Sequence, residues 1–218
     1  MTTADKPPQR RKPAQSRARV TSEAIQQAFV QLLAEKGYAK VTIREVISLA
    51  GVGIGSFYEY FSSKDALAAV CIHLRVKGIA QRMRQCIEAR RGEPLPVLVD
   101  ALLDAQIHDT LAEPEQWAAL FLLERQLSGI AAYRKGYEEF VQLWQQALAS
   151  AIHWPPGAPA HEAAFVAHAT AYSLTSQALM TQPRVPDPVA LRRMLRTAVH
   201  GYLSVLAPLA YRLHRFGE

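Results

Sequence analysis

A short segment near the N-terminus, residues 42–67, carries the pattern that most limits how this chain can fold. Its first part places apolar residues at i, i+3, i+4 and i+7, namely Ile43, Val46, Ile47 and Ala50. This spacing predicts a short helix with one buried face. Gly51 follows directly, and a glycine there supplies the left-handed backbone that ends a helix. A second short helix is expected almost at once, so the segment predicts a helix-turn-helix of the kind that binds DNA.

The second helix of this segment is expected to have two different faces. Val52, Phe57 and Phe61 are expected to point into the domain. The other face carries side chains of the types that contact thymine methyl groups, base edges and phosphates, and these are Ile54, Ser56, Tyr58 and Tyr60. The pattern therefore predicts that the second helix enters the major groove of DNA.

The run AGVGIGSFYEYFSSKDAL, residues 50–67, resembles the signature of the TetR/AcrR family of repressors. With the helical stripe that ends at Glu35-Lys36-Gly37-Tyr38, the resemblance covers roughly residues 20–70. Two positions depart from the family pattern. Gly53 stands where the family usually has a Ser or Thr helix cap, a change that costs only a few tenths of a kcal/mol. Tyr60 stands where histidine is more common.

The resemblance implies an all-α protein with an N-terminal three-helix helix-turn-helix DNA-binding domain, here residues 20–66. A helical effector-binding and dimerisation domain follows, here residues 67–218. A palindromic operator in double-stranded DNA would be contacted at its bases and phosphates by Thr42, Arg44, Gly53, Ile54, Gly55, Ser56, Tyr58, Tyr60 and Lys64. Within this set Ile54 and Ser56 would contact base edges, and Gly55 would let the backbone approach the DNA.

Positive charge is concentrated at the N-terminal end. Residues 1–64 hold ten Lys or Arg and five acidic residues, which accounts for +5 of the formal net charge of +6. This distribution favours a polyanionic partner at that end. Residues 1–19 are basic and contain three prolines, so we expect a flexible arm there. Such an arm is either a solvated tail or a further contact with phosphate or the minor groove.

Helices are expected downstream at 63–88, 95–112, 114–127, 131–151, 160–181 and 188–214, separated by Pro and Gly. The last two carry regular apolar stripes. Two such helices per chain could form an intermolecular four-helix bundle, as the resemblance implies for a homodimer. The alternative is that both stripes face the core of their own domain.

Aromatic residues recur at helical spacing in the second domain, where most serve an ordinary core. Together they could also line a pocket for a small hydrophobic effector, because such sites are mostly apolar with a few placed polar groups. The candidates are His108, Trp117, Phe121, Glu124, Tyr137, Trp144, Tyr172 and Thr175.

The sequence contains none of the catalytic or zinc motifs that would indicate an enzyme, and we expect no cofactor and no metal. Asp104 and His108 lie four residues apart and are more typical of a surface or core pair than of metal ligands. No segment reaches the ~20 apolar residues of a membrane span, so a cytoplasmic protein is expected. The predicted function is a repressor released from its operator by a ligand; the alternative is a ligand-binding or scaffold protein without sequence-specific DNA binding.

Overall fold

A computed structural model describes residues 13–182, 184 and 186–216 of the chain. Within this part every regular element is a helix, in agreement with the predicted all-α class. The chain forms two compact units, residues 1–68 and 69–218. None of the described helices is long and apolar enough to cross a membrane.

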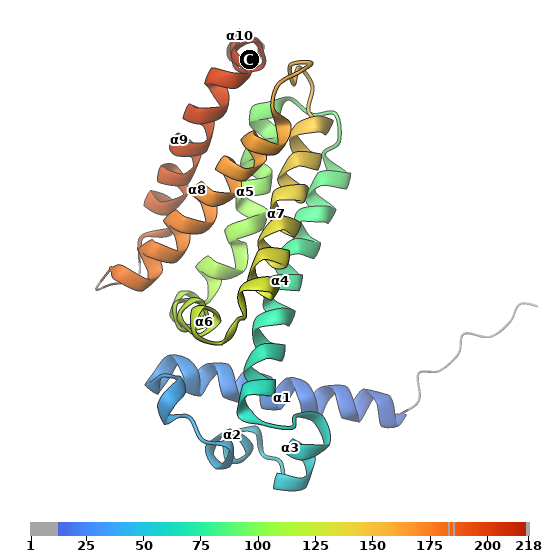
Figure 1. Ribbon diagram of the computed structural model, residues 1–218, viewed down its shortest axis with the longest axis vertical. Coiled ribbons are helices and arrows are strands. Elements are labelled where there is room, and N and C mark those ends of the chain that lie inside the picture. The colour runs from blue at the N-terminus through green and yellow to red at the C-terminus, as the bar shows by residue number, and fades with distance from the viewer. Residues whose placement is uncertain (1–12, 183, 185, 217–218) are drawn as a thin grey trace, which may run out of the picture. The chain divides into compact units, whose positions relative to one another are not determined.

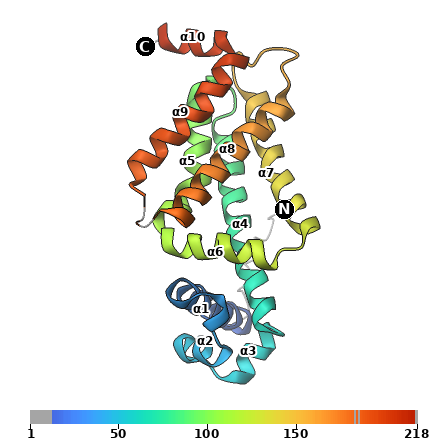
Figure 2. The same cartoon turned by 60° about the vertical axis from the view of Figure 1, so that its left-hand side comes forward.

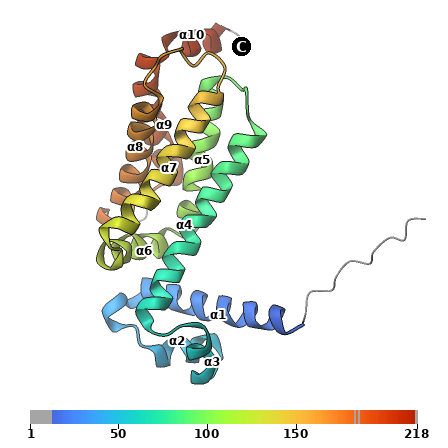
Figure 3. The ribbon, with the colours of Figure 1, turned by 45° about the vertical axis from the view of Figure 1, so that its right-hand side comes forward.

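The first unit consists of α1 (Pro13–Lys36), the short 3₁₀ helix η1 (Tyr38–Lys40), α2 (Ile43–Ala50), α3 (Ile54–Tyr60) and the first residues of α4 (Lys64–Ala89). Helix α1 packs against both α2 and α3, as Figure 3 shows. Helices α1, α2, α3 and α4 contribute fully buried apolar side chains to one small core, among them Phe29, Val46, Phe57 and Leu67. This core fixes which side of α3 is left exposed.

The predicted flexible arm is wrong for its last residues. Residues 1–12 lie outside the described part of the chain, but α1 already begins at Pro13 and runs through residue 19. Proline is well tolerated at the first position of a helix, because the N–H that it lacks would have no partner there. The prolines of this segment therefore gave no reason to expect an irregular chain as far as residue 19.

The second unit contains the rest of α4 and then α5 (Leu95–Ala112), α6 (Pro114–Leu127), α7 (Ile130–Ser150), α8 (Ala160–Thr181), α9 (Pro188–Leu206) and α10 (Pro208–Phe216). Helix α8 packs against α6, α7 and α9, and α5 packs against α7 and α9. Figures 1 and 2 show α5, α7, α8 and α9 running alongside one another, with α6 across one end of them and α10 across the other. Buried leucines of α5 and the fully buried Trp144 of α7 lie in the core of this unit.

The helix predicted at 188–214 is two helices, α9 and α10, because the chain breaks at Ala207. Ala207 has φ −128° and ψ 58°, outside the helical region. A proline disfavours helical geometry in the residue before it, and Pro208 is that proline. The apolar pattern continues across the break, since Ala207 and Ala210 are both buried.

The two cysteines, Cys71 and Cys86, both lie on α4 and form no disulfide. Burial raises the pKa of the Cys71 thiol to about 12, so this side chain stays protonated near neutral pH. Fifteen residues of helix separate the two by over ~20 Å, too far for a disulfide within one chain.

Candidate functional site

The turn between α2 and α3 depends on one glycine. Gly51 has φ 68° and ψ 32°, the left-handed conformation predicted from the sequence, and its N–H lies within hydrogen-bonding reach of the carbonyls of Ile47 and Ser48. The N–H of Val52 donates to the carbonyl of Ile47 at 3.0 Å. These bonds satisfy the free carbonyls at the end of α2 and turn the chain directly into α3.

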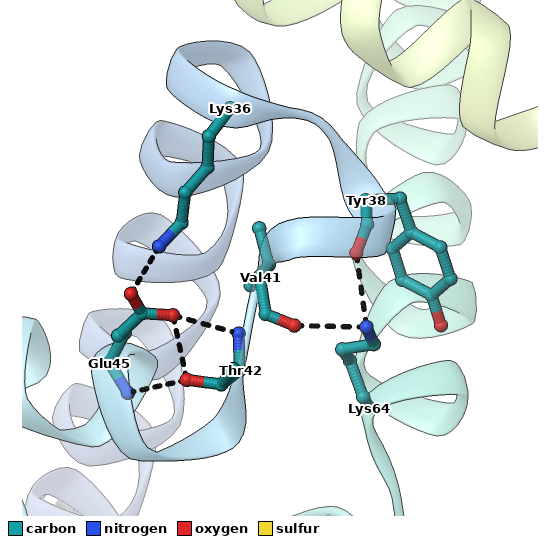
Figure 4. A network of polar contacts seen from close by, with 6 residues as sticks. All are labelled: Lys36, Tyr38, Val41, Thr42, Glu45 and Lys64. Atoms are coloured by element: carbon teal, nitrogen blue, oxygen red, sulfur yellow. Dashed lines mark hydrogen bonds and ion pairs between the residues drawn. The ribbon is translucent and has the colours of Figure 1, made fainter.

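The start of α2 is held by a capping box, drawn in Figure 4. The hydroxyl of Thr42 accepts from the backbone N–H of Glu45 at 3.3 Å, and the Thr42 N–H donates to the Glu45 carboxylate at 3.0 Å. Lys36, the last residue of α1, also donates to this carboxylate. Its hydrogen bond, together with those from Thr42, lowers the pKa of Glu45 to about 2. Glu45 therefore stays ionised and connects the end of α1 to the start of α2.

A second polar cluster surrounds Lys64 (Figure 4). Its ammonium donates to the backbone carbonyls of Tyr38 at 3.0 Å and Val41 at 2.9 Å, and it lies 4.3 Å from the centre of the Tyr38 ring. The Tyr38 hydroxyl in turn donates to Asp65, the next residue of α4. Lys64 thus joins the start of α4 to the segment that leads into α2. An ammonium has three hydrogens, so the two carbonyls leave one for another partner.

The buried Phe57 turns the opposite side of α3 towards solvent. Ile54 is 52% exposed and Tyr58 is 56% exposed, while Phe57 between them is fully buried. The other predicted DNA contacts of this helix region are exposed at Gly53 and Gly55 and half-buried at Ser56 and Tyr60. Thr42 and Arg44 on the α2 side are exposed as well, and Lys64 is half-buried. All nine predicted contacts thus belong to the first unit and keep some accessible surface.

The second unit contains a cavity of about 660 Å³. Six of the predicted pocket residues line it, namely Trp117, Phe121, Glu124, Tyr137, Tyr172 and Thr175. Rings of different helices meet around it. The centroids of Phe121 and Tyr172 are 5.7 Å apart in an edge-to-face arrangement, and those of Tyr137 and His168 are 4.5 Å apart. The lining therefore combines aromatic rings with aliphatic side chains and several polar or charged groups.

Two predicted pocket residues do not line this cavity. His108 is exposed on α5, and Trp144 is fully buried with its indole N–H donating to Gln106 at 2.8 Å. Asp104, four residues before His108, pairs with Arg192 and Arg196, in agreement with the preferred interpretation of a surface or core pair. Among the lining residues that sequence reasoning missed, two are in contact with each other. Gln106 and His168 are buried side chains there, and their side-chain nitrogens are 3.4 Å apart.

His168 behaves as a neutral part of the aromatic wall. It stacks on Phe140 with ring centroids 5.2 Å apart and planes 4° from parallel. Desolvation by burial lowers the pKa of His168 to about 3, so the imidazole is uncharged near neutral pH. Its position in the apolar stripe of α8 was visible in the sequence, but the same stripe could equally have served an ordinary core.

Replacing Thr175 with Val is expected to stabilise the second unit by about 1 kcal/mol. The Thr175 hydroxyl oxygen is buried and has no hydrogen-bond partner among the described residues. Valine has nearly the same shape and removes the unsatisfied group. Chemical denaturation of the full chain without ligand measures the change. Ser176→Ala is the matched comparison, because the neighbouring Ser176 hydroxyl is hydrogen-bonded and its removal should destabilise instead. A loss of stability in Thr175→Val would show that the hydroxyl has a partner.

Comparison with known proteins identifies the first unit. The family described as bacterial regulatory proteins, tetR family, matches residues 25–71, which contain the capping box, the Gly51 turn and α3. The first unit of this chain is therefore of the tetR-family type. The match accounts for the fold of the first unit and leaves most of the second unit unmatched.

Two curated relatives of this chain are uncharacterized HTH-type transcriptional regulators of Bacillus subtilis (strain 168). YerO is 31% identical over 87 residues, which is 40% of this chain and 30% of that protein. YvdT is 47% identical over 45 residues, which is 21% of this chain and 23% of that protein. The matched segments therefore span less than a third of each relative, so the similarity does not extend to the function of the whole protein.

Solved structures similar to this chain cover most of its length. A TetR transcription regulator from Haloarcula marismortui has a TM-score of 0.69 at 19% identity, covering 85% of this chain and 97% of that one. Escherichia coli NemR in its reduced form has a TM-score of 0.63 at 20% identity, covering 86% and 97%. A SmeT–triclosan complex has a TM-score of 0.65 at 22% identity, covering 85% and 90%. These similarities establish the fold over the 85–86% of the chain that they cover.

Proposed function

We propose that this chain is a sequence-specific DNA-binding transcriptional regulator, a repressor released from a palindromic operator by a small hydrophobic ligand. The observation that carries the proposal is the exposed face of α3, where Ile54 and Tyr58 lie in solvent at i and i+4 while Phe57 is buried. An exposed apolar side chain such as Ile54 adds little to the stability of a helix-turn-helix. Contact with a thymine methyl group would bury it and would explain why it is apolar.

Base contacts in this proposal come from Ile54 and Ser56, with Gly53 and Gly55 allowing the backbone to approach the duplex. Phosphate contacts come from Thr42, Arg44, Tyr58, Tyr60 and Lys64. Phosphate contacts fix the register of the protein on DNA and carry no sequence information directly, whereas the base contacts specify the site. The capping box and the Lys64 cluster support this arrangement by holding α2 and its flanking segments in one geometry.

We propose that two copies of the chain associate through α8 and α9. Only part of the apolar stripe predicted along α9 is available to a second copy. Leu191, Leu195 and Val199 of this stripe are buried in the core of their own unit. A neighbouring row stays in solvent, however, and it consists of Met194, Ala198, Gly201 and Val205 at i, i+4, i+7 and i+11. Leu174 of α8 is exposed as well. Such a row of apolar and small residues suits a helix–helix contact with a second copy, and a two-fold dimer would match a palindrome.

The cavity of the second unit supports the proposed response to a ligand. Its volume of about 660 Å³ and its aromatic lining are typical of a small-molecule site. SmeT, which shares the fold, was solved as a triclosan complex. Helix α4 contributes to the cavity lining and begins in the first unit, so it is the element through which a bound ligand could act on DNA binding. A ligand does this only by binding the DNA-incompetent state more tightly.

Selection of the purified full chain on random duplex DNA tests the proposal. We expect recovery of a palindrome with half-sites about one DNA turn apart, together with a dimer in analytical ultracentrifugation. Titration of the enriched duplex at two salt concentrations measures the phosphate contribution. Enrichment of no sequence, or binding that only follows charge and disappears with salt, would support the alternative of a ligand-binding protein without sequence-specific DNA binding.

A further inference from the structure

One wall of the cavity is built from matching faces of α6 and α8. Trp117, Phe121 and Glu124 lie at i, i+4 and i+7 of α6 and share one face of that helix. His168, Tyr172 and Thr175 have the same spacing on α8. The rings of Phe121 and Tyr172 meet edge to face where the two helices approach each other. An acidic side chain is thereby set into a wall of aromatic rings.

Glu124 is the unusual member of this wall. Its carboxylate accepts a hydrogen bond from the Tyr172 hydroxyl at 3.2 Å, and within the described part of the chain it forms no ion pair. Glu139, the other acidic residue of the lining, is paired with Arg84. Desolvation by burial raises the pKa of Glu124, which shows that the site offers its negative charge too little compensation.

Arg125 follows Glu124 in sequence but is directed elsewhere. Its guanidinium donates to the Phe121 carbonyl at 3.1 Å and to the Ser176 hydroxyl at 3.4 Å. It is not part of the cavity lining. Its charge therefore acts on the Glu124 carboxylate from a distance and leaves the side of the carboxylate that faces the cavity available to another cation.

The aromatic rings around Glu124, like its carboxylate, favour a positively charged ligand. The faces of Trp and Tyr rings carry negative electrostatic potential and attract cations, most strongly where water is excluded. Rings of α6, α7 and α8 line the cavity, and they include Trp117, Tyr133, Tyr137 and Tyr172. Arg75 already lies 5.8 Å from the centre of the Trp117 ring, and Arg125 lies 6.0 Å from that of Tyr172. Tyr133 and Tyr137 are therefore the rings on which a ligand cation would rest.

The two arginines of the lining have partners in the protein, and its two lysines are exposed. Arg75 pairs with Glu113 and hydrogen-bonds Gln116, and Arg84 pairs with Glu139. Lys77 and Lys135 are exposed, so water screens their attraction for an anion. The half-buried Glu124 carboxylate is screened less.

We infer that the cavity binds a lipophilic organic cation, with its positive charge against Glu124 and its apolar groups among the aromatic rings. This inference rests on the proposed effector-binding role of the second unit and specifies the chemistry of the effector. It narrows the sequence prediction of a hydrophobic effector, because a neutral or anionic molecule would leave the Glu124 carboxylate desolvated without a counter-charge.

Tetraphenylphosphonium and tetraphenylborate provide the test, because they have nearly the same shape and apolar surface and opposite charge. Their affinities for the full chain are measured by calorimetric titration. Wild type is expected to bind the phosphonium at least about tenfold more tightly than the borate, the factor that corresponds to one charge-assisted contact. Glu124→Gln keeps the shape of the side chain and an acceptor for Tyr172, and should lower this preference about tenfold.

Glu139→Gln is the matched control, since it removes a cavity-lining carboxylate that already has a partner. It should change the preference much less than Glu124→Gln does. Equal or tighter binding of the borate by wild type, no phosphonium binding, or an unchanged preference in Glu124→Gln would each overturn the inference.

A measurement of DNA release from the enriched duplex tests the proposed repressor function separately from the cation-binding site. Phosphonium binding that depends on Glu124 but does not release DNA would leave the cavity assignment standing and count against ligand-controlled repression. Release of DNA by a neutral compound, with no dependence on Glu124, would support the repressor function and contradict the cation.

Discussion

Replacing Phe57 with Ala is expected to destabilise the DNA-binding unit by about 3–5 kcal/mol, the usual effect of removing a buried aromatic ring. Phe57 is fully buried at the centre of α3, and its ring centroid lies 5.9 Å from that of Phe61. Since a domain is stable by only about 5–15 kcal/mol in total, most of the first unit should then be unfolded or open. DNA binding should fall sharply. Amide hydrogen exchange measures the change, because it reports the stability of each unit separately.

The neighbouring Tyr58 provides the control for this substitution. Tyr58 is 56% exposed, so Tyr58→Ala should change stability by less than about 0.5 kcal/mol. It should still weaken DNA binding, because Tyr58 is a proposed phosphate contact. Slow exchange in the second unit should be the same in both variants. Normal exchange protection of α3 in Phe57→Ala, or normal DNA affinity in Tyr58→Ala, would show that the assigned inner and outer faces of α3 are wrong.

The helix boundaries that could be predicted are those that local chemistry determines. The ends predicted for α5, α6 and α8 agree with the structure residue for residue. Gly51 ends α2 because a left-handed residue was required there, and the sequence offered glycine. The break at Pro208 was missed because proline also suits the first turn of a helix, so a continuing apolar pattern could not show that α10 begins there.

The pocket residues were predicted less completely than the helix boundaries, because they depend on which face each helix turns towards the cavity. Buried residues occur on most sides of α5, so periodicity could not show that His108 faces solvent while Gln106 lines the cavity. Trp144 lies seven residues after Tyr137 on α7, and the two therefore share a face. Only Tyr137 lines the cavity, since Trp144 is enclosed by the core and bonded to Gln106. Spacing along a helix gives its face but not where a cavity ends.

The Lys64 cluster could not be predicted from sequence at all. The family resemblance implied a phosphate contact for Lys64, whereas its two carbonyl partners are 26 and 23 residues earlier in the chain. No local pattern relates a lysine to backbone oxygens at such a distance. The structure therefore adds a structural role to a residue that the motif associates only with DNA.

Replacing Lys64 with Met is expected to destabilise the first unit by about 1.5–3 kcal/mol, the net contribution of hydrogen bonds to a charged group. Methionine keeps much of the apolar stem but leaves the carbonyls of Tyr38 and Val41 without their donor. Amide exchange along η1 and α2 should quicken most, because these segments adjoin the two carbonyls. The salt dependence of DNA binding should also fall by about one phosphate contact, through the ammonium hydrogen that the carbonyls leave free.

Lys40→Met is the matched control, because it removes the same charge from an exposed lysine of η1. It should leave exchange in α2 nearly unchanged, so a difference between the two variants reflects the carbonyl bonds and not the net charge. The two measurements on Lys64→Met are independent of each other. Faster exchange with an unchanged salt slope would mean that Lys64 acts on DNA binding only by holding the entry to α2 in place. A lower slope with unchanged exchange would mean that the phosphate contact alone accounts for this lysine.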